Sequence, residues 1–175
     1  MVIPMYYINC FFVYSFIGFW FECIMGKLMG NRFESGILFG PFTPVYGIGV
    51  VLILMLSKFF FQNLHMPRWK ETIIVFFILV FALTFIEWIG GILIEKLFHI
   101  TFWDYTDLKF NLGKYIALEI SLAWGFLSLL LIYVIHPLLS DFIKKIPLWI
   151  TYLLIFAISI DFICTFMKYK FGYFK

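Results

Sequence analysis

Long apolar stretches constrain this chain more than any other feature of its sequence. Of its 175 residues, 64% are hydrophobic and 13% are charged, whereas a typical soluble domain is about 45–50% apolar and about 25% charged. A helix needs about 20 apolar residues to cross the hydrocarbon core of a bilayer, and an open sheet would leave its edge groups unpaired there. We therefore predict an all-α fold, a polytopic transmembrane helix bundle of about five spans that forms one integral membrane domain over residues 1–175. The predicted spans cover residues 4–28, 46–62, 72–96, 114–135 and 147–167.

The first connection, over residues 31–46, has an unusual composition. It contains Gly36, Gly40, Pro41 and Pro44, which interrupt regular helix. Irregular backbone at membrane depth is tolerated only where it packs on protein or lines water. We expect an irregular first loop and interpret it as a candidate re-entrant segment.

The distribution of basic residues predicts an orientation. With five spans, the first loop, the third loop and the C-terminus share one side of the membrane. Eight of the 13 basic residues fall on that side, and short loops rich in Lys and Arg stay in the cytoplasm. We expect a multi-pass protein of the cytoplasmic membrane with a cytoplasmic C-terminus.

Five acidic residues interrupt the apolar spans. Because consecutive spans alternate in direction, all five fall toward the same membrane face. An ionisable group at mid-bilayer costs about 2.5–3.5 kcal/mol on insertion scales and normally faces the bundle interior or a wet cavity. We therefore predict a polar pocket for a substrate or ion. Its predicted lining is Glu22, Glu87, Glu95, Glu119 and Asp161.

Three of these acids belong to two segments that share one helical pattern. Ser15, Gly18, Glu22 and Gly26 follow offsets that place them on one helix face, and Thr84, Glu87, Gly91 and Glu95 follow the same offsets. Small residues on such stripes let helices approach closely. A stripe that serves packing, with protonated acids bonded between helices, is the alternative interpretation.

The first and third loops flank the predicted pocket, and we expect them to form its mouth. Trp and Tyr side chains there also suit a plain role as anchors at the headgroup level. The predicted mouth residues are Arg32, Pro41, Tyr46, Trp103, Asp104, Tyr105 and Asn111.

The sequence lacks the motifs of several common kinds of active and binding site. The chain has no phosphate-binding loop, nucleophile elbow or dinucleotide-binding turn. Its three His and three Cys residues are scattered without ligand spacing, so we predict no metal site and no cofactor. The net charge of +3 is small and dispersed, which does not favour nucleic acid as a partner.

The loop motifs and the acids together resemble a bacterial family called putative type IV ABC-transporter permeases. The resemblance rests on Gly36-Ile37-Leu38-Phe39-Gly40-Pro41, Pro44-Val45-Tyr46-Gly47 and Trp103-Asp104-Tyr105, with Glu22, Glu87, Glu95, Trp124 and Asp161 in order along the chain. It implies a permease subunit that works with a separate ATPase subunit in a homo- or hetero-oligomer.

The leading hypothesis is a permease-like subunit whose carboxylates line a cavity open to one membrane face. A membrane-embedded enzyme that acts on a lipid or isoprenoid by carboxylate acid and base chemistry is an alternative. A non-catalytic assembly or regulatory partner is another. The sequence does not specify the substrate, the energy source or the oligomeric state.

Overall fold

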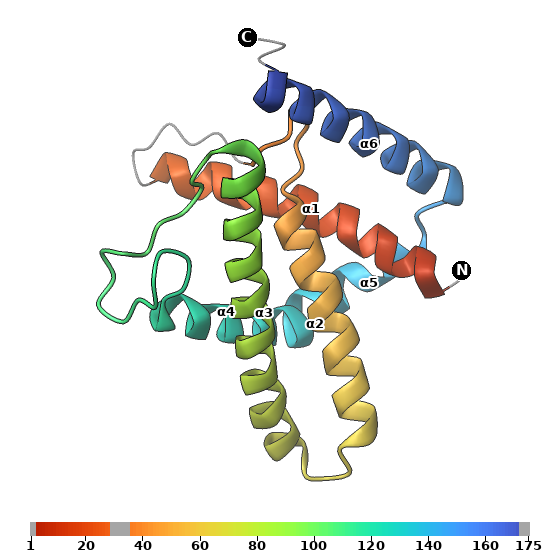
Figure 1. Cartoon of the computed structure of the whole chain (residues 1–175). Helices are drawn as coiled ribbons and strands as arrows, with labels where there is room; N and C mark the ends of the chain where they lie inside the picture. The colour runs from red at the N-terminus through yellow and green to blue at the C-terminus, as the bar shows by residue number, and fades with distance from the viewer. Residues whose placement is uncertain (1–2, 29–35, 172–175) are drawn as a thin grey trace. The chain divides into compact units, whose positions relative to one another are not determined.

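The computed structural model describes residues 3–28 and 36–171 of the chain. Five of its helical segments are long and apolar enough to cross a membrane: Pro4–Leu28, Pro44–Asn63, Arg68–Phe98, Leu118–Lys144 and Leu148–Phe171. Among the described residues there is no β-strand, only an isolated bridge between Asn111 and Ala117. The predicted all-α polytopic fold with five spans is thus confirmed (Figure 1). The elements are α1 (Ile3–Leu28), α2 (Pro44–Asn63), α3 (Arg68–Phe98), α4 (Leu118–Leu130), η1 (Leu131–Ile135), α5 (His136–Lys144) and α6 (Leu148–Phe171).

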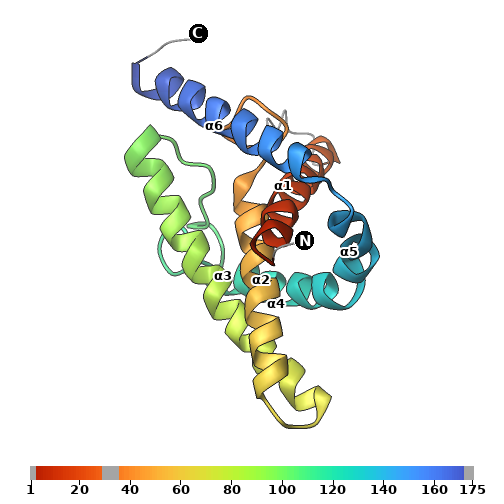
Figure 2. The ribbon, with the colours of Figure 1, turned by 90° about the vertical axis from the view of Figure 1, so that its right-hand side faces the viewer.

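Proline residues mark where several helices begin. Pro44 is the first residue of α2 and Pro67 directly precedes α3, positions where a missing backbone N–H costs little. The turn between α2 and α3 is short (Figure 2). There the Arg68 guanidinium lies 4.1 Å from the centre of the Phe61 ring.

The fourth span is longer than predicted and begins later. Residues 114–117 belong to the preceding loop, because Leu112 N–H bonds the Ile116 carbonyl and Leu118 N–H bonds the Phe110 carbonyl. The helix then continues through a π-helical turn, η1, into α5. Pro137, in the first turn of α5, has no N–H to donate to an α-helical hydrogen bond, and π-type turns absorb such interruptions.

The chain forms two compact units, the first comprising Met1–Val51 and Leu139–Lys175 and the second Leu52–Leu138. In the first unit, α6 packs on α1. A buried hydrogen bond of 2.6 Å runs from the Thr151 hydroxyl of α6 to the Asn9 side chain of α1. Phe12, Leu38 and Ile158 form the apolar core of this unit.

Residues 36–43, the described part of the first loop, are non-helical and enter the first unit. Leu38 is buried with Phe12, and Thr43 N–H donates to the Ser15 carbonyl at 3.0 Å. Ser15 lies 13 residues before the end of α1 at Leu28, which is about 20 Å along a helix. The irregular loop is therefore confirmed, and its contact with the middle of α1 supports the re-entrant interpretation.

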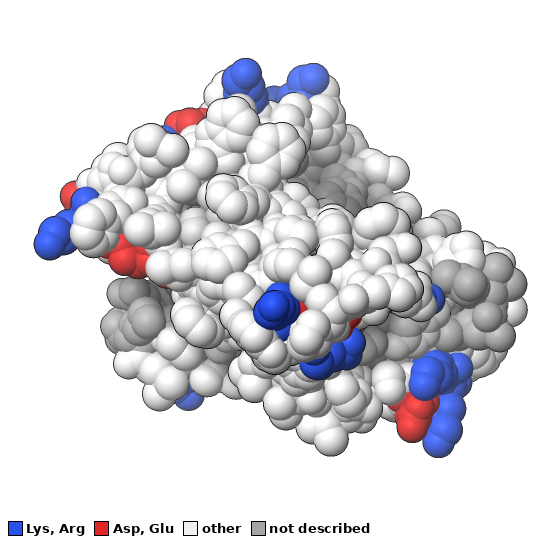
Figure 3. Space-filling view, turned by 90° about the horizontal axis from the view of Figure 1, so that it is seen from below, with Lys and Arg blue, Asp and Glu red and all other residues white. Residues whose placement is uncertain are grey.

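In the second unit, α4 crosses α3 rather than running alongside it (Figure 1). Gly125 makes the close approach feasible, since a Cβ there would lie 2.5 Å from Val80 and 2.6 Å from Phe76. Most large side chains outside these contacts are apolar and exposed, for example Phe81 at 75%. The mostly uncharged surface in Figure 3 is typical of a protein that faces lipid.

Candidate functional site

The candidate site lies on one face of α3, in the second unit. Glu87, Gly91 and Glu95 are spaced four residues apart and so share this face. Glu87 is buried and Glu95, two turns nearer the end of α3, is half-buried. The loop of residues 99–117 returns over this face before α4 begins (Figure 1).

The Glu87 carboxylate accepts one hydrogen bond on each oxygen. The Tyr105 hydroxyl donates to Oε1 at 2.7 Å, and Nε1 of Trp124 donates to Oε2 at 3.2 Å. Tyr105 comes from the loop and Trp124 from α4, so this one carboxylate ties three segments together. Both donors are neutral, and Glu87 has no ion-pair partner within the described part of the chain.

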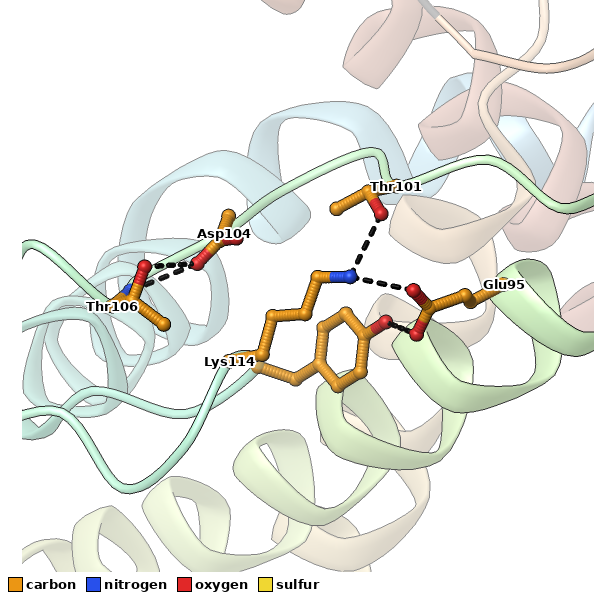
Figure 4. Close-up of polar contacts among 6 residues, drawn as sticks. Glu95, Thr101, Asp104, Thr106 and Lys114 are labelled. Atoms are coloured by element: carbon orange, nitrogen blue, oxygen red, sulfur yellow. Dashed lines mark hydrogen bonds and ion pairs between the residues drawn. The ribbon is translucent and has the colours of Figure 1, made fainter.

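The Glu95 carboxylate has a cationic partner instead (Figure 4). Nζ of Lys114 donates to Glu95 Oε1 at 2.6 Å and to the Thr101 hydroxyl at 2.9 Å. The Tyr115 hydroxyl donates to the other oxygen, Oε2. The hydrogen bond to Glu95 raises the pKa of Lys114, and desolvation followed by the same carboxylate raises the pKa of Tyr115.

Gly91 makes room for Tyr115 between the two acids. A Cβ on Gly91 would lie 2.5 Å from Cδ1 of the Tyr115 ring, well inside normal contact. Trp103 packs at the edge of the same ring, with a centroid separation of 6.3 Å, and lies beside Gly90. Gly91, the glycine predicted on this stripe, therefore admits an aromatic ring from the loop.

Short polar contacts shape the loop itself. The Asp104 carboxylate accepts hydrogen bonds from the Thr106 hydroxyl at 2.7 Å and the Thr106 N–H at 3.0 Å (Figure 4). These bonds lower the pKa of Asp104. The Asn111 amide donates to the carbonyls of Thr106 and Leu108 at 2.6 and 2.8 Å. Positive φ angles at His99 and Gly113 provide the reversals at each end.

A second carboxylate arrangement lies in the first unit. Asp161 of α6 accepts the Phe39 N–H at 2.9 Å and the Gly40 N–H at 2.7 Å, one on each oxygen. Its Oδ1 also accepts the Thr165 hydroxyl at 3.2 Å. This clamp fixes the first loop on α6, beside an open groove of about 350 Å³ lined by Phe39, Ala157, Ile160, Asp161 and Cys164.

The remaining predicted lining residues lie in different surroundings. Glu119, in the first turn of α4, is exposed and accepts the Phe110 N–H at 3.2 Å. Glu22 is half-buried near the end of α1. The structure thus brings Glu87 and Glu95 together under one loop, and a cavity shared by all five acids remains a prediction.

The predicted mouth residues divide in the same way. Trp103, Asp104, Tyr105 and Asn111 all belong to the loop of residues 99–117, where Tyr105 reaches Glu87 directly. In the first unit, Pro41 is exposed, while Tyr46 packs against Gly18 of α1. Arg32 lies outside the described residues.

Four residues that complete the site are not among the predicted pocket or mouth residues: Thr101, Lys114, Tyr115 and Trp124. Of these, Trp124 enters the sequence-based expectations only as part of the family resemblance. The predicted fourth span begins at Lys114, whereas in the structure Lys114 and Tyr115 belong to the loop that precedes α4. Gly91, on the stripe that carries the two acids, is the sequence feature that indicates a close approach by a neighbouring group.

Among the described residues, no group of three or more His, Cys, Asp or Glu side chains is arranged to bind a metal ion. A family model described as "Putative ABC-transporter type IV" matches residues 9–168. No curated protein and no solved structure matches the chain.

Proposed function

Because the chain belongs to the family described as "Putative ABC-transporter type IV", we propose that it is the membrane-spanning permease subunit of an ABC-type transporter. It is a multi-pass membrane protein by its five apolar helices. The sequence contains no phosphate-binding loop for ATP. ATP hydrolysis in this proposal therefore belongs to a separate ATPase subunit.

One observation carries the proposal: Glu87 is a buried carboxylate in an apolar helix and its hydrogen-bond donors are neutral. An ionisable group in a span is costly and normally serves a substrate or ion pathway. Glu87 and Glu95 share one face of α3, and the loop of residues 99–117 covers both. In this proposal they line the polar pathway, and Tyr105 lies at its mouth.

The wider cavity is part of the same proposal. Glu22, Glu119 and Asp161 complete its lining. The protein resides in the cytoplasmic membrane with the C-terminus in the cytoplasm, as the excess of basic residues on that side favours.

The experiment is a comparison of two buried acids on α3. Glu87→Gln keeps the size of the side chain and removes its charge, and Glu71→Gln does the same to a buried acid near the start of α3. Uptake of a panel of radiolabelled amines, amino acids and sugars is measured in cells with and without the chain. We expect Glu87→Gln to abolish the chain-dependent uptake and Glu71→Gln to retain it.

Protein level and melting temperature in detergent serve as controls for folding. Chain-dependent uptake that is unchanged in Glu87→Gln, at equal protein level, would contradict the pathway.

A further inference from the structure

The Lys114 ammonium is held by three different kinds of group. A carboxylate oxygen of Glu95 lies at 2.6 Å and the Thr101 hydroxyl at 2.9 Å, and Nζ lies 5.3 Å from the centre of the Tyr115 ring. Carboxylate, hydroxyl and aromatic face are the groups that recognise an ammonium ion in proteins. The loop and the end of α3 therefore present a complete set of contacts to one ammonium group.

Two of these groups, Glu95 and Tyr115, are held in position by contacts that do not involve Lys114. Tyr115 is fixed by its hydrogen bond to Glu95, by the close approach to Gly91 and by the edge of Trp103. Glu95 is part of α3 and keeps its bond to Tyr115 whether or not Lys114 is bound. Glu95 and Tyr115 would therefore stay in place if the Lys114 side chain left.

The site is also accessible from outside. The side chains of Lys114 and Glu95 are 31% and 44% exposed. The Lys114 ammonium is joined to the backbone by a flexible four-carbon side chain. The ammonium can therefore leave the site without displacement of the backbone.

The charges around the site favour an additional cation. Glu87 and Glu95 lie on the face of α3 under the loop, and Asp104 lies on the loop itself. Lys114 is the cation that pairs with Glu95. In the part of the chain that the structure describes, neither Glu87 nor Asp104 has an ion-pair partner. A partly dehydrated region with excess negative charge raises the local concentration of cations.

We propose that Glu95, Thr101 and Tyr115 form a binding site for the primary ammonium group of a ligand, and that Lys114 occupies this site when the ligand is absent. Lys114 then acts as an internal competitor, which leaves when the ligand binds. That the ligand is transported rests on the proposed function, whereas its binding does not.

The test uses the full chain in lipid nanodiscs with n-propylammonium as the probe. Tetramethylammonium is the matched control because it carries the same charge but no N–H donor. Lys114→Ala empties the site, and Lys96→Ala removes an exposed cation next to Glu95 on α3. We expect propylammonium to raise the melting temperature of Lys114→Ala saturably, and to bind it about tenfold more tightly than tetramethylammonium does.

The native chain and Lys96→Ala should show little change at the same concentrations, because Lys114 fills the site. Glu95→Gln in the Lys114→Ala background should lose the effect. Equal binding of the two cations, or undiminished binding after Glu95→Gln, would overturn the proposal.

A second measurement does not depend on the folding of Lys114→Ala. In the native chain with 13C-labelled lysine, high concentrations of propylammonium should move the Cε signal of Lys114 toward that of a solvated lysine, with Lys114→Arg used for assignment. A signal that propylammonium leaves unmoved would reject Lys114 as a competitor. Because both measurements report binding, their failure is distinct from a failure of transport.

Discussion

Each carboxylate of the candidate site is held by donors from another segment of the second unit. Glu87 binds Tyr105 and Trp124, and Glu95 binds Lys114 and Tyr115. An unpaired buried carboxylate would pay a large desolvation cost, so these donors make the acids tolerable in an apolar helix. At the scale of the residue, the acids therefore also organise the loop.

Gly91 is the residue at which this packing is tightest. In Gly91→Ala the new methyl group would meet the Tyr115 ring at 2.5 Å, and the ring has to shift. We expect a loss of about 1–3 kcal/mol of stability, as is usual for overpacking, measured by reversible denaturation in detergent. The neighbouring Gly90→Ala is the control, since its methyl group would lie 3.8 Å from Trp103. Equal stability of the two variants would contradict the position of Tyr115.

Asp104 makes the stability of the loop depend on pH in the acid range. Its hydrogen bonds with Thr106 lower the pKa of Asp104 below the ordinary value of 3.8. Because the folded pKa is depressed, the stabilisation is present above pH 3.8 and is lost as the pH falls through the lower, folded value. We expect the melting temperature of the native chain to fall more over this window than that of Asp104→Asn. Parallel pH profiles for the two proteins would contradict this role of Asp104.

At the scale of the element, hydrogen bonds of backbone N–H groups hold the irregular segments in place. In the first loop, two consecutive N–H groups bind the two oxygens of Asp161. Gly40 permits this approach, since a Cβ there would lie 2.9 Å from Asp161 Oδ2. Non-helical backbone inside a membrane protein needs such partners because lipid offers none.

Asp161→Asn should loosen the first loop. Asn has only one side-chain oxygen, so one of the two backbone N–H groups loses its acceptor, at a cost of about 1–3 kcal/mol. Buried Leu38 reports the change: after replacement of the native cysteines, Leu38→Cys should react faster with a maleimide in the Asp161→Asn background. Ser159→Ala, which removes a hydroxyl bonded within α6, should leave the rate unchanged. An unaltered rate in Asp161→Asn would argue against the clamp.

At the scale of the whole molecule, the chain is a multi-pass membrane protein. Five apolar helices account for most of its length, and the family match covers residues 9–168. The sequence contains no phosphate-binding loop for ATP. A partner subunit is therefore central to the proposed transport.

The orientation is testable with reporter fusions. Because basic residues favour the side of the C-terminus, a fluorescent protein fused after Lys175 should be active in the cytoplasm. Alkaline phosphatase inserted at His65, in the turn between α2 and α3, should be active on the opposite side. The reversed pattern would invert the proposed topology.

The sequence by itself determined that five helices are long and apolar enough to span a membrane, because the length and apolarity of a segment decide whether it can cross a bilayer. It also determined that Glu87, Gly91 and Glu95 share a face, since helical periodicity is local. Only the tertiary structure decided which groups meet them. Lys114 and Tyr115 lie about 20 residues from Glu95 along the chain, and their approach depends on a loop that long-range hydrogen bonds and close packing define. Those contacts follow no period in the sequence, so the two acids on α3 could be predicted, while the ammonium and the tyrosine that bind Glu95 could not.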